Sequence, residues 1–468
     1  MPQISPRFGT TFTRSAATST SGSPETTATT HELARVLRLR DVILIVVGSV
    51  IGSGIFLVPG GVLRDSGGDV GLALLVWIVG GGLSLLGALT YAELGAMNPR
   101  AGGLYVYLRD AFGPLPAFLY GWALFFVIGS GSIATLSAAF ARYIQQFVAL
   151  SVPGAKLVSL ATILVVTLVN VWGTRRGAVV QNWSTAIKVG ALLLLSAMLL
   201  TTGNGLAAAP VRVLSTPLSS QLLRGMAVAM VAVLWAYEGW HYVTFSAGEI
   251  VEPQRIFARG IIAGTAAIVV IYLLANLGYL AALGPAGVAQ SNRVAADAVT
   301  TLFGDTWGRL VAIPILVSIF GAANGIALTA PRVFYAMARD GLFFRKLAEV
   351  HPRFGTPAVA IVAGSAWTMV LAGSGTFEQL LTYVVFTGWA FYALAAATIF
   401  VYRRRLPHAA RPFRVPGYPL TPALFIVAAS GIVASTLVSR PTQALLGIGI
   451  ILLGMPAYWW WRRSNRAA

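Results

Sequence analysis

The sequence of 468 residues has no cysteine, only four histidines, and charged residues make up only 10% of it. Without cysteine, the chain forms no disulfide and performs no thiol chemistry. The histidines occur in no paired or HExxH spacing, so we expect neither a metal site nor a cofactor. A soluble domain of average composition carries about 25% charged residues. The low charge content therefore argues against a soluble protein.

The dominant feature is apolar sequence, with 57% hydrophobic residues and a mean hydropathy of +0.77. Apolar runs recur along nearly the whole chain, which indicates an all-α integral membrane protein rather than a barrel of short alternating strands. A helix needs roughly 20 residues to cross the bilayer. On that basis we predict twelve transmembrane helices, at 41–63, 70–97, 115–147, 155–172, 179–201, 222–247, 258–284, 307–338, 357–374, 377–401, 419–438 and 442–461.

The net charge of +18 resembles the signature of a nucleic-acid-binding protein, but membrane topology explains it better. Most arginines and lysines fall in loops on the side that holds the N-terminus, and basic loops remain cytoplasmic. We therefore expect a multi-pass protein of the cell membrane, inner or plasma, with both termini in the cytoplasm and no nucleic-acid partner. Residues 1–33 are predicted to be a disordered cytoplasmic tail, 34–463 a single transporter domain and 464–468 a second cytoplasmic tail.

The segment GSVIGSGIF, from Gly48 to Phe56, places three glycines in the middle of the first span. Glycine inside a helix is about 1 kcal/mol less favourable than alanine. The segment therefore predicts either a broken helix lining a site in the membrane or, because Gly48 and Gly52 form a Gly-x-x-x-Gly pair, a close helix-packing seam.

A second interruption, WAYEGWHY from Trp235 to Tyr242, lies in the sixth span. Interrupted spans at matching positions in two halves are typical of transporters with an inverted repeat. We predict repeats at about 41–201 and 222–401, each of five helices with the first one broken, and two additional helices at about 419–461. Exposed N–H groups at one half-helix end suit a carboxylate and released carbonyls suit an ammonium, so the pattern favours an α-amino acid as ligand.

Ionisable residues within spans are functional candidates. Lys188 is predicted to be a fixed ammonium that replaces a bound cation beside the first break, with a proton-coupling role or a purely structural contact as alternatives. Glu238 could contact a substrate amine, carry a coupled proton or cap the resumed helix. Glu93 and Glu249 are predicted to pair with nearby arginines, and His241 to be a hydrogen-bonded helix residue, with a proton relay as the alternative.

Several segments resemble the amino acid–polyamine–organocation superfamily, and most closely its L-type amino-acid transporters and their bacterial relatives. They are GSVIGSGIFLVPGGVL, YAELGAMNPRAGGLYVYLRDAFGPLPAFLYGW, WAYEGWHYVTFSAGEIVEP and FGAANGIALTAPRVFYAMARDGLFF. The resemblance covers about residues 35–463. It implies a fold of five plus five inverted helices with two more, which works by alternating access.

The resemblance also implies a set of substrate-binding residues. The N–H groups of Gly52, Ser53 and Gly54 would hold the carboxylate, and carbonyls near Val50 and Ile51 would hold the amine. The second break would contribute Trp235 as a gate, together with the other residues around it. The expected set is Val50, Ile51, Gly52, Ser53, Gly54, Ile128, Ser132, Trp235, Ala236, Glu238, Gly239 and Asn324, with Lys188 in the place of a sodium ion.

The chain departs from the animal members of that family at Glu238, His241 and Trp235, where they commonly have glycine, asparagine and phenylalanine. These differences bear on substrate size and charge. The absence of cysteine excludes a disulfide-linked heavy chain as partner. We predict a sodium-independent exchanger or facilitator of neutral L-amino acids. The alternatives are a proton-coupled or cationic amino acid or polyamine carrier and, more remotely, a channel or a membrane enzyme.

Overall fold

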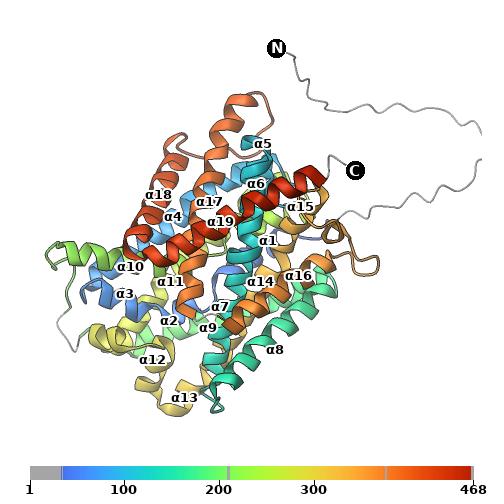
Figure 1. Ribbon diagram of the computed structural model, residues 1–468. Helices are drawn as coiled ribbons and strands as arrows, with labels where there is room; N and C mark the ends of the chain where they lie inside the picture. Colours follow the sequence, from blue (N-terminus) through green and yellow to red (C-terminus); the bar gives the residue numbers. More distant parts are fainter. Residues whose placement is uncertain (1–32, 34, 208–210, 375–376, 465–468) are drawn as a thin grey trace, which may run out of the picture. The chain divides into compact units, whose positions relative to one another are not determined.

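The computed structural model describes residues 33, 35–207, 211–374 and 377–464 (Figure 1). Every regular element in these ranges is a helix, and no β-strand occurs among them. The all-α prediction is therefore confirmed for the described part of the chain. The predicted tails lie almost wholly outside these ranges.

The first half of the chain ends at the long helix α9. Its elements are α1 (Leu39–Val50), α2 (Gly54–Leu57), α3 (Pro59–Asp65), α4 (Val70–Met97), α5 (Leu104–Phe112), α6 (Pro114–Ala123), the π-helical turn η1 (Leu124–Ile128), α7 (Gly129–Ile144), α8 (Val152–Val171) and α9 (Thr174–Thr202).

The second half begins with another interrupted helix. Its elements are α10 (Ser220–Ala236), the 3₁₀ helix η2 (Tyr242–Glu249), α11 (Pro253–Gln290), α12 (Val294–Phe303), α13 (Asp305–Leu310), α14 (Ala312–Thr329), α15 (Pro331–Arg339), the 3₁₀ helix η3 (Arg345–Ala348), α16 (Ala358–Ser374), α17 (Phe377–Arg405), α18 (Leu420–Ser439) and α19 (Pro441–Ser464).

Among the described residues, ten helical segments are long and apolar enough to cross a membrane. Ten of the twelve predicted spans overlap these segments, and the remaining two fall on the shorter helices α10 and α16. The sixth span differs from its predicted range of 222–247, because α10 ends at Ala236 and the chain resumes as η2. The chain between the ninth and tenth spans lies partly outside the described residues.

The spans divide into buried and peripheral ones. In an apolar stretch of 18 residues within the Pro114–Ile144 and Leu39–Leu57 segments, 78% and 72% of the residues are buried, against 28% in the same length of α8, 28% in α18 and 22% in α19. Helix α1 packs against α9, α11 and α14. Figure 1 shows α8 beside α16 on one flank and α19 crossing α17. The first broken helix therefore lies inside the bundle, where its free backbone groups face protein rather than lipid.

A carboxylate outside the membrane fixes the start of α4. Asp69 accepts the N–H of Leu72 and also the backbone N–H groups of Leu214, Ser215 and Thr216, at 2.9 to 3.1 Å. Burial alone would raise the pKa of Asp69, but the four N–H donors outweigh it and lower the pKa from 3.8 to about 2. This one side chain ties the α3–α4 turn to the segment before α10.

Candidate functional site

The two interruptions predicted from the sequence are present, and they touch each other. Helix α1 ends at Val50 and α2 begins at Gly54, while α10 ends at Ala236. A Cβ on Gly54 would lie 2.6 Å from the Cα of Ala236. Gly239, with φ of +119°, would likewise bring a Cβ to 2.9 Å from the carbonyl oxygen of Ser49. Only glycine allows the two breaks to pack this closely.

Gly48 supports the other interpretation of this segment, a close helix-packing seam. A Cβ there would lie 2.0 Å from Oγ1 of Thr185 on α9, so α1 also packs on α9 through a small residue. Both interpretations of GSVIGSGIF hold: Gly48 packs against α9, and the helix breaks between Val50 and Gly54.

The two broken segments run in opposite directions. Leu37, before α1, pairs with Ile250, just after η2. At the other end, Leu57 and Val58 line the same cavity as Val231 and Ala232 of α10. This antiparallel arrangement is the one that an inverted repeat requires.

A small cavity of about 20 Å³ lies where the breaks meet. It has room for little more than one water molecule. Its walls come from both breaks and from α7 and α14, namely Ser49, Val50, Gly52, Ser53, Gly54, Ser132, Leu136, Trp235, Glu238 and Ile326. Seven of these ten residues belong to the set expected from the sequence, which lacks Ser49, Leu136 and Ile326. Ser49 lies within the motif itself, whereas no local pattern marks the other two.

One wall of this cavity is rich in hydrogen-bond donors. Among the described residues, the backbone N–H groups of Gly52, Ser53 and Gly54 donate to no acceptor. The side-chain hydroxyls of Ser49 and Ser53 are buried and also have no partner there. Such a group of N–H donors at the beginning of a half-helix can bind an anion, and a group of this size suits a carboxylate.

Side chains from α9, α14 and α11 donate hydrogen bonds to the released carbonyls of the first break. Lys188 Nζ, from α9, donates to the carbonyl oxygens of Gly48 at 2.9 Å and Ile51 at 2.7 Å. Its third acceptor is the carbonyl of Ser318 on α14, at 2.8 Å. The hydroxyl of Ser318 also donates to Ile51, at 3.0 Å. With only 1% of its surface exposed, Lys188 is a buried ammonium enclosed by carbonyls.

A tyrosine links the two breaks. The hydroxyl of Tyr272, on α11, lies 3.1 Å from the carbonyl oxygen of Val50 and 3.0 Å from that of Ala236. A carbonyl oxygen has two lone pairs, so Val50 and Ala236 each retain one, whereas both lone pairs of Ile51 are used. Ile51 also does not line the small cavity. Sequence reasoning missed Tyr272 and Ser318, which lie outside both breaks, on α11 and α14.

Glu238 lies at the opposite wall within a cluster of rings. Its Oε1 accepts a hydrogen bond of 2.5 Å from the hydroxyl of Tyr392 on α17. His241 Nε2 is 4.0 Å from the same oxygen, and its ring packs 4.1 Å from that of Tyr392, centroid to centroid. Neither nitrogen of His241 has a hydrogen-bond partner among the described residues. The prediction of a hydrogen-bonded histidine was therefore wrong, because aromatic rings surround it.

The remaining predicted binding residues lie near the breaks but away from the cavity wall. Asn324 donates to Gln181 Oε1 at 3.0 Å and accepts from Asn170 Nδ2 at 2.9 Å, so it belongs to a polar network between α8, α9 and α14. The carbonyl of Ile128 accepts the Ser132 hydroxyl at 2.7 Å. Ala236 and Gly239 form the contacts between the breaks described above.

A second cavity, of about 270 Å³, lies on the α3 side of the breaks. Val231 and Ala232 line it, and Trp235 follows one turn later on α10 and lines the small cavity. Trp235 therefore stands between the two cavities. We call the larger one the vestibule.

The end of the site opposite the vestibule is closed. Arg332 Nε lies 2.7 Å from Glu249 Oε1, and the pair is fully buried, with Thr174 accepting from the same guanidinium. Glu93 pairs with Arg403 at 2.7 Å and with Arg411 at 3.4 Å. The predicted pairing of both glutamates with arginines is confirmed.

Comparison with known proteins agrees with this geometry. Residues 37–456 match the family described as amino acid permease. The chain belongs to the amino acid permease family. It is therefore a multi-pass membrane transport protein and not an enzyme.

Individual relatives cover most of the chain. A serine/threonine exchanger of Bacillus subtilis is 32% identical over 430 residues, which is 91% of this chain and 97% of the relative. The human cystine/glutamate transporter is 33% identical over 435 residues, covering 92% and 85%. The mouse Asc-type amino acid transporter 1 is 31% identical over 442 residues, covering 90% and 81%.

Proposed function

We propose that this permease is a sodium-independent exchanger or facilitator of neutral L-amino acids in the cell membrane. Its twelve helices would form two inverted repeats and two additional helices, with both termini in the cytoplasm. The antiparallel broken segments and their direct contact support the repeat, and the excess of basic residues in loops on the N-terminal side supports the orientation.

The substrate would bind between the breaks. Its carboxylate would accept the N–H groups of Gly52, Ser53 and Gly54, which have no acceptor among the described residues. Its amine would use the remaining lone pairs of the Val50 and Ala236 carbonyls. The three N–H groups and the Val50 carbonyl belong to residues that line the small cavity, and Tyr272 lies within hydrogen-bond distance of both the Val50 and the Ala236 carbonyls. Donors and acceptors in one place suit a zwitterion better than a simple anion or cation.

Binding would require movement, because about 20 Å³ is far too small for an amino acid. A rotation of Trp235 would join the small cavity to the vestibule and admit substrate from the α3 side. Release at the other end would require the buried Glu249–Arg332 pair and the Leu37–Ile250 contact to separate. In alternating access, the substrate site opens first to one side of the membrane and then to the other.

One observation carries the proposal of sodium independence. The Lys188 ammonium already donates to the carbonyls of Gly48, Ile51 and Ser318, so a fixed cation holds the oxygens that a bound metal ion would need. Purified protein in proteoliposomes should take up labelled serine or leucine equally well with choline in place of sodium. As an exchanger, it should do so faster with unlabelled amino acid inside. Uptake that disappears without sodium would overturn the proposal.

Glu238 supports a second candidate, a proton-coupled carrier or a carrier of cationic amino acids or polyamines. Its carboxyl group lines the cavity, where it could face a second ammonium. Glu238→Gln should then abolish arginine or putrescine uptake while leaving leucine uptake intact. Glu252→Gln, at an exposed residue, is the matched control. If arginine and putrescine fail to compete with leucine in the wild type, the neutral-substrate proposal stands.

The proposal includes no obligatory protein partner. The absence of cysteine means that any heavy chain would have to be held without a disulfide. The single purified chain should therefore transport. A requirement for a second polypeptide would contradict this part of the proposal.

A further inference from the structure

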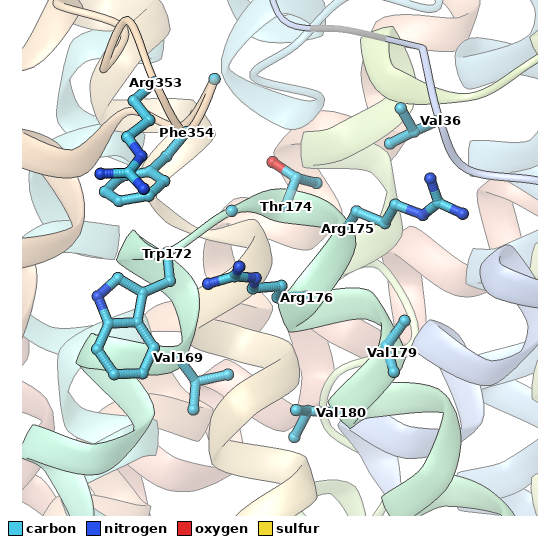
Figure 2. A pocket seen from close by; sticks show the side chains of 12 residues that line it. Val36, Val169, Trp172, Thr174, Arg175, Arg176, Val179, Val180, Arg353 and Phe354 are labelled. Carbon is cyan, nitrogen blue, oxygen red and sulfur yellow. The ribbon is translucent and has the colours of Figure 1, made fainter.

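A wide groove lies away from the transport site. It has a volume of about 990 Å³ and is formed where α8 ends and α9 begins, with the loop that follows η3 opposite (Figure 2). Figure 2 shows the side chains of Arg175 and Arg176 on the α9 side and Arg353 beside the ring of Phe354. We call this feature the basic groove.

The three arginines of the basic groove have no anionic partner among the described residues. All are exposed, and none forms an ion pair with a described residue. Arg353 lies over the ring of Phe354, with Cζ 5.6 Å from the ring centroid. By contrast, the glutamates Glu93 and Glu249 are fully engaged by other arginines. Three uncompensated guanidinium groups around one hollow attract an anion, and guanidinium is well suited to phosphate.

Apolar side chains on the α8–α9 side of the groove lie beside Arg175 and Arg176 and are exposed (Figure 2). Trp172 is 50% exposed and Val179 is 47% exposed. Trp172 lies in the turn between the apolar spans α8 and α9, and Val179 lies near the beginning of α9, which places them at the surface of the bilayer. Tryptophan is enriched at that depth, where its ring contacts lipid and its N–H remains near the headgroups.

We infer that the basic groove binds an anionic phospholipid, with its phosphate among Arg175, Arg176 and Arg353 and its upper acyl chains against Trp172 and Val179. The charge selects an anionic headgroup, because a choline headgroup would add a cation beside three guanidinium groups. The apolar wall selects a lipid over a soluble phosphate, which would leave Trp172 and Val179 uncovered. Basic pockets at the ends of transmembrane helices are suited to such headgroups.

The test compares lipids and variants on the full purified chain. Lipid titrations in detergent, followed by thermal unfolding and by native mass spectrometry, would use phosphatidylglycerol, phosphatidylcholine and soluble glycerol 3-phosphate. The groove variant is the triple change Arg175→Gln, Arg176→Gln and Arg353→Gln. The control variant removes the same charge from exposed arginines outside the groove, namely Arg259→Gln, Arg404→Gln and Arg414→Gln.

The groove variant should bind phosphatidylglycerol at least about tenfold more weakly than the wild type, while the control changes by about twofold or less. Phosphatidylcholine and glycerol 3-phosphate should produce little stabilisation. Equal affinity of the groove variant and the wild type would overturn the inference, as would equal binding of the two lipids. Full competition by glycerol 3-phosphate would instead assign the groove to a soluble anion and would also overturn it. If the triple variant does not fold, Arg353→Gln alone, in a loop, should still weaken phosphatidylglycerol binding.

Discussion

Lys188 offers the sharpest test of how this permease works. Lys188→Met keeps most of the length of the side chain and removes the ammonium that holds the first break. Lys346→Met removes the same side chain and charge from an exposed position and is the matched control. The prediction is that transport falls strongly in Lys188→Met although the protein still folds.

The expected change in stability follows from the hydrogen-bond partners that each carbonyl keeps in Lys188→Met. Without the ammonium, the carbonyl of Ile51 keeps the hydroxyl of Ser318, and the carbonyl of Ser318 lies inside the continuous helix α14. Only the carbonyl of Gly48 is then left without a hydrogen-bond partner among the described residues, and an unsatisfied buried carbonyl costs about 1–3 kcal/mol. The loss of a buried charge, with its desolvation penalty of several kcal/mol, offsets part of that cost. Global stability should therefore change by no more than about 3 kcal/mol.

Transport should be more sensitive than stability. The ammonium connects the break to α9 and α14, and a bias of about 1–3 kcal/mol between two conformations changes their populations by about 5- to 150-fold. Exchange of labelled amino acid in proteoliposomes should therefore fall within that range for Lys188→Met and remain at the wild-type rate for Lys346→Met. Thermal unfolding of both proteins shows whether they fold. A folded Lys188→Met protein with wild-type exchange would refute the reasoning and reduce Lys188 to a packing residue.

Three further predictions concern the surroundings of the site. Gly54→Ala should abolish transport, because its Cβ would lie 2.6 Å from a backbone atom of α10, whereas Gly82→Ala, with nothing within 4 Å, should leave transport unchanged. Arg332→Gln should destabilise the protein by about 3–5 kcal/mol in thermal unfolding, since Glu249 would remain buried without its partner, and a loss below about 1 kcal/mol would contradict this. Asp69→Asn should remove about 2 kcal/mol of stability near neutral pH, because the folded-state pKa is lowered from 3.8 to about 2. That difference should shrink as the pH falls from about 4 to 2, where the wild-type carboxylate is protonated, and a pH-independent difference would exclude the electrostatic explanation.

The sequence alone was sufficient for the membrane class, most of the spans and both interruptions. These features follow from local composition: a helix must be apolar over about 20 residues to cross a bilayer. Glycines clustered in the middle of such a run weaken the helix at that point. The positions of Gly52, Ser53 and Gly54 at the cavity could be predicted because the motif that breaks the helix also exposes the N–H groups.

Only the tertiary structure decided which groups complete the site. Tyr272, Ser318 and Tyr392 lie on other helices, and no local pattern distinguishes them from other polar residues in apolar spans. Their contacts join positions far apart in the sequence, and they depend on helix rotation and register. Asn324 illustrates the same limit, because its rotation on α14 directs its amide toward α8 and α9 instead of the cavity. A break in a helix is thus determined by its own residues, whereas the partners of the freed backbone groups are determined by packing.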